Sequence, residues 1–228
     1  MNTRGLLDQL LKSGQQMLEK QGGGNKSGSA AGGLGGLLSG AGGGLLGGGA
    51  LGLLLGSKKA RKYGGKALTY GGLAALGVLA YKAYGNWQAN QRGAAAEPQT
   101  VDRLPPAQVE QHSQAVLRAL VAAAKSDGHI DERERALIEG EFTRLDSDRE
   151  LQHWLHAELN KPLDPAEVAR AAQTPEMAAE MYLASVMMVD EEHFMERAYL
   201  DELAKQLKLA PGLKTELENQ VRQAQLSN

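Results

Sequence analysis

The chain has 228 residues, of which 29 are glycine and none is cysteine, so disulfide bonds and thiolate metal sites are excluded. Its net charge of −2 conceals two unlike parts: residues 1–100 carry eleven Lys and Arg against three Asp and Glu, whereas residues 101–228 carry fourteen against twenty-four. The basic part suits an anionic membrane surface, and the acidic part argues against nucleic acid as a partner.

The N-terminal segment, residues 1–30, is predicted to contain a short amphipathic helix followed by a hinge. Within residues 3–20 the leucines lie near one helical face and the charged side chains lie elsewhere. Such a helix suits a membrane surface or a partner helix, and a weakly ordered tail is the alternative. Residues 21–30 are rich in Gly and Ser, which is typical of a hinge.

Residues 31–87 are predicted to form a membrane region, because their first part repeats glycine at every fourth position and carries no charge between Ser27 and Ser57. This spacing places the glycines on one face of a helix, where they let a second helix approach closely in lipid. In water each glycine would cost about 1 kcal/mol relative to alanine. We interpret the stretch as a membrane glycine zipper, and a flexible linker is the alternative. The zipper glycines are Gly32, Gly36, Gly40, Gly44, Gly48, Gly52 and Gly56.

A second apolar stretch, residues 67–81, contains no charged side chain, and extending it to residues 63–84 brings it to the ~20 residues that a membrane span requires. Lys66 and Lys82 lie near its ends, where their long side chains can reach the membrane surface. Two arrangements fit: either both apolar stretches form a hairpin, or only the second one spans. In either case we expect the lipid bilayer as a partner and self-association through the zipper.

Five Lys and Arg side chains lie between Lys58 and Lys66, in the loop that separates the two apolar stretches. Basic loops of this kind stay on the cytoplasmic side of the bacterial inner membrane. The C-terminal part would then lie across the membrane, in the periplasm of a Gram-negative cell.

Residues 88–106 are polar and proline-containing, which predicts a linker, and residues 107–228 are predicted to form an all-α domain. Helix starts are marked by Ser147 with Glu150, by Asp164 with Pro165, and by Thr174 with Pro175. The expected helices are 107–126, 132–145, 148–160, 165–172, 175–189, 195–208 and 211–225. His112, His153 and His156 are expected on helix surfaces.

Two acidic segments of this domain resemble each other, since each follows an apolar helix and offers Asp, His, an apolar residue and Glu before the next helix. Clustered carboxylates suit a hard cation such as Ca²⁺ or Mg²⁺, although the spacing is not that of an EF-hand. The alternative is structural: Asp131 would cap a helix with Glu134, and Ile130 and Phe194 would pack into the core.

The run Ala-x-Ser-Asp-Gly-His-Ile-Asp-x-x-Glu from Ala124 to Glu134, followed by Asp-x-x-His-Phe-Met-Glu-Arg from Asp190, resembles the tellurite-resistance TerB-like domain. The whole chain is similar to the YebE-type bacterial inner-membrane proteins of unknown function. The resemblance implies a helical bundle, a bacterial envelope location and divalent-metal binding by acidic residues of the two segments. The implied ligands are Asp127, Asp131, Glu134, Asp190 and Glu196, with His129 and His193 nearby.

These observations favour a membrane-anchored helical interaction or sensing module that binds a protein partner not identified by the sequence and responds to a divalent cation. A structural membrane protein that self-associates through the glycine zipper, without a metal site, is the alternative. An enzyme is not expected, because the chain has no Ser/His/Asp set, phosphate loop or nucleotide-binding fingerprint.

Overall fold

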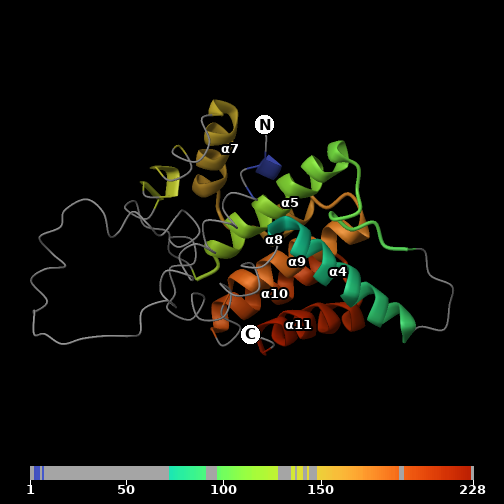
Figure 1. The fold of residues 1–228 in the computed structure, drawn as a ribbon. Coiled ribbons are helices and arrows are strands. Elements are labelled where there is room, and N and C mark those ends of the chain that lie inside the picture. Colours follow the sequence, from blue (N-terminus) through green and yellow to red (C-terminus); the bar gives the residue numbers. More distant parts are fainter. Residues whose placement is uncertain are drawn as a thin grey trace, which may run out of the picture.

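The computed structural model describes residues 3–5, 7, 72–90, 97–127, 135, 136, 138–140, 143, 148–189 and 193–226. Every regular element formed by these residues is a helix, which confirms the all-α prediction for the part of the chain that is described (Figure 1). The helices are α4 (Gly72–Ala89), α5 (Pro106–Ala124), α7 (Arg149–Asn160), α8 (Pro165–Ala169), α9 (Pro175–Met188), α10 (Phe194–Gln206) and α11 (Pro211–Leu226).

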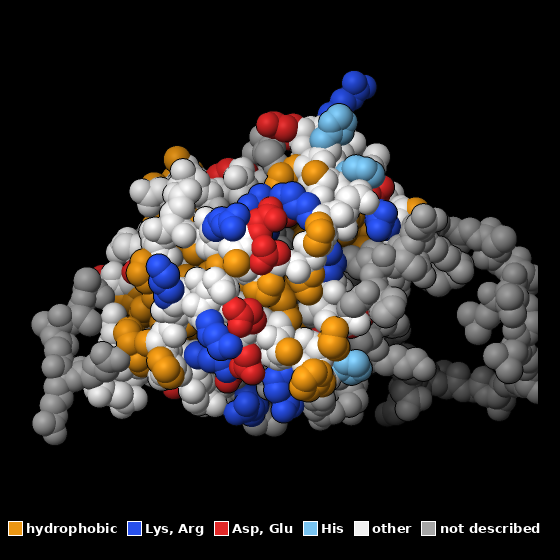
Figure 2. Space-filling model, turned by 180° about the vertical axis from the view of Figure 1, so that it is seen from behind, with side chains coloured by type: hydrophobic (Ala, Val, Ile, Leu, Met, Phe, Trp, Pro, Cys, Tyr) orange, Lys and Arg blue, Asp and Glu red, His pale blue; other side chains and the backbone are white. Residues whose placement is uncertain are grey.

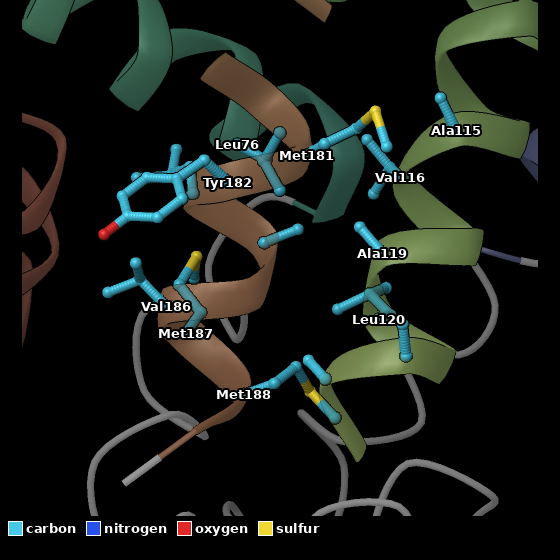
Figure 3. Packing of buried hydrophobic residues seen from close by; sticks show 14 of the residues in the cluster. Leu76, Ala115, Val116, Ala119, Leu120, Met181, Tyr182, Val186, Met187 and Met188 are labelled. Atoms are coloured by element: carbon cyan, nitrogen blue, oxygen red, sulfur yellow. The ribbon is translucent and has the colours of Figure 1, made fainter. Parts of the chain in front are cut away.

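Helix α9 lies at the centre of the bundle, and every residue from Met177 to Met188 is buried. A helix that is apolar around its whole circumference needs protein on all sides, and α9 is contacted by α4, α5, α10 and α11. Figure 3 shows Met181 pointing toward Val116 on α5, whereas Tyr182 points to the opposite side of the helix. There the Tyr182 hydroxyl donates a hydrogen bond of 2.6 Å to Glu218 on α11.

Helix α4 belongs to the core of this bundle, packed beside α11 and against α9 (Figure 1). The side chain of Asn86 also donates a hydrogen bond of 2.6 Å to Glu216 on α11. Among the described residues, none of the helices has both the length and the apolar character needed to cross a bilayer, so the predicted membrane span is not supported there. The buried side chains of α4 are Leu73, Leu76, Ala80, Ala83 and Tyr84.

The zipper glycines and the basic loop lie outside the described residues. The glycine zipper, and the choice between one span and a hairpin, therefore stay predictions. At the N-terminus, residues 3–5 and 7 are helical and Leu7 is fully buried. The backbone N–H groups of Thr3 and Arg4 donate hydrogen bonds of 2.7 Å and 3.2 Å to the carboxylate of Glu110 on α5, so this segment contacts the bundle.

The predicted helix starts are mostly confirmed at the level of single hydrogen bonds. The Asp164 carboxylate accepts the Ala166 N–H at 2.9 Å, and the Thr174 hydroxyl accepts the Met177 N–H at 3.1 Å. The N-cap residue of α7 is Asp148, one residue after the predicted one, and its carboxylate accepts the Glu150 N–H at 2.9 Å. Of the helix expected at 132–145, the described residues 135, 136, 138–140 and 143 are helical.

Candidate functional site

Only two of the five predicted cation ligands fall within the described residues. Asp127 is exposed beyond the end of α5, and Glu196 is buried in the first turn of α10. His193, the N-cap residue of α10, is exposed and makes no side-chain cap bond. The described residues contain no group of three or more potential metal ligands. The other proposed ligands, Asp131, Glu134 and Asp190, and the neighbouring His129, lie outside the described part, so the cation site stays a prediction.

The expectation that Phe194 packs into the core is wrong. Its side chain is 81% exposed, and the adjacent Met195 is 54% exposed. The buried face of α10 is formed instead by Glu196, Tyr199, Leu200, Leu203 and Ala204. Phe194 precedes this face, so the first turn of the helix points it away from the bundle.

A buried pair of polar residues was missed from the sequence. His112 is 4% exposed, and its Nδ1 atom lies 2.5 Å from Oε2 of Glu180, which has no exposed surface. The prediction that His112 lies on a helix surface is therefore wrong, whereas His153 and His156 are exposed as expected. The sequence does contain a signal for the burial of His112, because this residue lies three residues after Val109 and four before Val116 on the buried face of α5.

Glu180 also binds the chain segment that precedes α5. Its Oε1 atom accepts the backbone N–H of Val101 at 2.5 Å, so one carboxylate joins α5, α9 and residues 97–104. Burial raises the pKa of Glu180 above its ordinary value, although the hydrogen bonds from His112 and Val101 act in the opposite direction. Residues 97–104 lie in the range expected to be a linker, yet Thr100 and Val101 are buried.

A network of charges joins α5, α7 and α8. Glu158 accepts from Arg118 at 3.2 Å and from Lys161 at 2.7 Å, and Lys161 also contacts Glu167 at 2.9 Å. Lys125 donates to the backbone carbonyls of Glu158 and Lys161, at the end of α7, and burial lowers its pKa. Lys and Arg side chains lie close beside Asp and Glu side chains on the face seen in Figure 2. We assign this network to positioning α7.

A groove of about 660 Å³ lies on the surface of the described bundle, and we name it the Trp87 groove. It lies between the C-terminal end of α4, α8 with the turn after it, the start of α9, the end of α10 and the start of α11. Trp87 contacts Tyr84 edge to face, with the ring centroids 5.9 Å apart. Much of the apolar lining comes from Tyr84, Trp87, Ala169, Ala172, Leu209 and Leu213.

The position of Trp87 depends on a glycine at the start of α11. A methyl group added at Gly212 would lie 3.1 Å from Cδ1 and 3.2 Å from Nε1 of the Trp87 indole. The absence of a side chain at Gly212 thus lets the indole lie against the α11 backbone. This close approach fixes one wall of the Trp87 groove.

Lys208 lies on another wall of the groove, in an unusual backbone conformation. Its φ of 55° is left-handed, which costs about 1–2 kcal/mol for a residue with a side chain. The backbone N–H groups of Lys208 and Leu209 donate to the carbonyls of Lys205 and Ala204, at 2.9 Å and 3.1 Å. These bonds form the Schellman motif that ends α10, in which glycine normally occupies the left-handed position.

The described part of the chain is thus a small all-helical bundle with a groove on its surface. A family model described as "Protein of unknown function (DUF533)" matches residues 40–221, which include α4 and most of the bundle. The chain therefore belongs to the DUF533 family. This family is TerB-like, which confirms that part of the resemblance, whereas the narrower YebE-type resemblance stays a prediction.

The chain is also similar to a Yersinia enterocolitica protein described as "Uncharacterized protein in ampR 5'region". The two are 35% identical over 131 residues, which cover 58% of this chain and 93% of the relative. No solved structure gives a significant match.

Proposed function

We propose that this chain is a helical interaction module of the bacterial envelope, in which the Trp87 groove binds a segment of a partner protein. The observation that supports this proposal is the groove itself, with two aromatic side chains and an apolar wall contributed by five helices. A volume of about 660 Å³ lies within the range of roughly 300–1,000 Å³ typical of ligand sites.

The chemistry of the lining favours binding over catalysis. The described lining residues are Ala, Leu, Pro, Tyr, Trp, Gln, Thr, Arg and Lys, and among them there is no carboxylate and no imidazole for acid–base work. The hydroxyl of Thr174 accepts the N–H of Met177 as the cap of α9. Trp and Tyr in a partly apolar hollow are the residues on which binding energy is most often concentrated.

We further propose that residues before α4 attach the module to the inner membrane, with the bundle in the periplasm. Residues 32–56 are uncharged and have glycine at every fourth position, and a basic loop follows them; both features support this placement. The glycine register also supports the alternative, in which the chain is mainly a structural membrane protein that associates with copies of itself.

Site-specific photo-crosslinking in intact cells tests the proposal. A photoreactive phenylalanine analogue replaces Gln173, an exposed residue of the groove, or His153, an exposed residue of α7 outside the groove. After irradiation the membranes are washed with alkaline carbonate, which removes peripheral proteins, and the adducts are identified.

We expect the chain to remain in the washed membranes and the Gln173 variant to give one discrete adduct with another protein that the His153 variant does not give. Release of the chain by carbonate would contradict membrane integration. Equal adducts from both positions would contradict the claim that the partner binds in the Trp87 groove. Adducts made only with copies of this chain would favour the structural alternative.

A further inference from the structure

The charge of the Trp87 groove has one sign. Of the described residues that line it, only Arg170 and Lys208 are charged, and both are exposed cations. Among the described residues, Arg170 forms no ion pair, although it interacts electrostatically with Glu167 of α8, three residues earlier. Lys208 forms no ion pair with a described residue. Lys205 behaves differently from Lys208: it lies three residues earlier, outside the groove, and it pairs with Glu202 at 3.1 Å.

The backbone at Lys208 adds an independent observation. The end of α10 is closed by backbone hydrogen bonds, which do not require a lysine side chain. Glycine would adopt the φ of 55° without strain, so a lysine here has a cost in stability. Strained residues cluster at binding sites, where the side chain has a use that offsets the strain. At Lys208 that use is to present a cation in the groove.

The polar groups of the lining favour a peptide over a lipid. Gln173 is an exposed lining residue whose side-chain amide matches the hydrogen-bonding groups of a peptide backbone, whereas the Gln206 amide already donates to Glu202 at 2.8 Å. An acyl chain would offer the Gln173 amide no hydrogen-bonding group, whereas a peptide segment offers both apolar side chains and backbone N–H and C=O groups. The aromatic and leucine lining suits the apolar face of an amphipathic segment.

We infer that the Trp87 groove binds an acidic amphipathic segment of a partner protein, whose apolar side chains cover Trp87 and Leu213 and whose carboxylates pair with Arg170 and Lys208. This inference rests on the proposed function and adds the chemistry of the partner. Its basis is the combination of an apolar groove, two cations without ion pairs and a strained backbone at one of them.

The test uses the full chain in nanodiscs of zwitterionic phosphatidylcholine. Because the chain has two tryptophans, the substitution Trp154→Phe leaves Trp87 as the single indole and its emission as a report on the groove. The probes are three synthetic amphipathic peptides of about fifteen residues, long enough to become helical, with the same leucines and either glutamate, glutamine or lysine between them. Each peptide is titrated and its Kd is obtained from the Trp87 emission.

We expect the glutamate peptide to shift Trp87 emission and to bind more tightly than the glutamine peptide, with the lysine peptide weakest. Lys208→Gly should weaken binding of the glutamate peptide about twofold to fivefold, as loss of one exposed ion pair would. The same variant should melt about 2–4 °C higher, because the left-handed strain is gone, so weaker binding cannot come from unfolding. Lys208→Arg should restore binding, and the matched control Lys205→Ala should leave it unchanged.

Equal Kd values for the three peptides, or an unchanged Kd in Lys208→Gly, would overturn the inference. So would a Trp87 emission that none of the peptides changes. If phosphatidylglycerol nanodiscs without peptide shift Trp87 emission, and Lys208→Gly removes that shift, the ligand is a lipid headgroup and the inference is also overturned. The Gln173 adduct separates the two proposals: if it forms while the peptide series fails, the groove still binds a protein, but not through acidic groups.

Discussion

Glu180 is the only charged residue between Met177 and Val189, and it has no exposed surface. A buried carboxylate is tolerated when hydrogen bonds satisfy it, and Val101 and His112 provide them from two other parts of the chain. The residue therefore fixes how the segment before α5 lies on α9. Its contribution should depend on pH, because burial raises its pKa.

The first prediction concerns Glu180→Ala and Glu180→Gln. The alanine variant leaves the Val101 N–H and the His112 ring nitrogen without their buried partner, so it should lower the free energy of unfolding by about 2–4 kcal/mol. The glutamine variant can keep both bonds, with its amide oxygen accepting from Val101 and its NH₂ group donating to neutral His112. Urea unfolding of the two variants and the parent at one pH checks this order.

The pH dependence of the stability of the parent and of Glu180→Gln gives a second measurement. A carboxyl whose folded-state pKa lies above its unfolded value of 4.5 loses stability as pH rises from that value through the folded-state pKa. The stability of the parent relative to Glu180→Gln should therefore fall as pH rises from about 4.5. A difference that stays constant, or rises, between about pH 4.5 and 8 would show that Glu180 is not the titrating group.

At the scale of elements, α4 is held by contacts that leave no room for a side chain at one position. A methyl group added at Gly77 would lie 2.5 Å from Oδ1 and 2.8 Å from the backbone N of Asp102, and 2.8 Å from the side chain of Val101. Gly85 lies on the same helix, and an added methyl group would meet nothing within 4 Å. Gly77 and Gly85 are therefore a matched pair of positions for substitution by alanine.

Gly77→Ala should destabilise the protein by about 1–3 kcal/mol, because residues 101 and 102 must move away and lengthen the bond from Val101 to Glu180. Gly85→Ala should stabilise it by about 0.5–1 kcal/mol through the higher helix propensity of alanine. Thermal unfolding of both variants measures the difference. Equal melting temperatures would mean that residues 97–104 do not pack on α4 in solution.

At the scale of the whole molecule, α4 completes the bundle. Burial of Leu73 and Leu76 alone contributes about 3–6 kcal/mol, and their partners lie in a core shared with α9 and α11. The family model extends over α4 as well as the helices that follow, which agrees with this packing. This packing leads us to expect that the folded unit begins before residue 107, the predicted start of the C-terminal domain.

We predict that a fragment of residues 72–228 unfolds in one cooperative transition, whereas a fragment of residues 97–228 has a lower urea midpoint and binds the dye ANS. Removal of α4 exposes apolar surface of α9 and α11, and exposed apolar surface is what ANS detects. Urea unfolding and dye fluorescence of the two fragments check the prediction. Equal midpoints without dye binding would place α4 outside the folded unit.

The sequence by itself determined where α8, α9 and α11 begin, since Asp164, Thr174 and Pro211 act within one turn of their own positions. The sequence of α9 also requires burial of most of its surface, because Glu180 is the only charged residue between Met177 and Val189. Only the tertiary structure decided that α4 packs on protein. An apolar helix face is satisfied by lipid or by another helix, and the sequence of α4 does not distinguish the two.

The tertiary structure also decided the site. His112 and Glu180 are 68 residues apart, so their pairing depends on how α5 crosses α9 and not on any local pattern. The Trp87 groove likewise needs five elements to be placed beside one another before its wall exists. Local hydrogen bonds set helix ends because they act over a few residues, whereas grooves and buried polar pairs arise from long-range packing that no short stretch of sequence encodes.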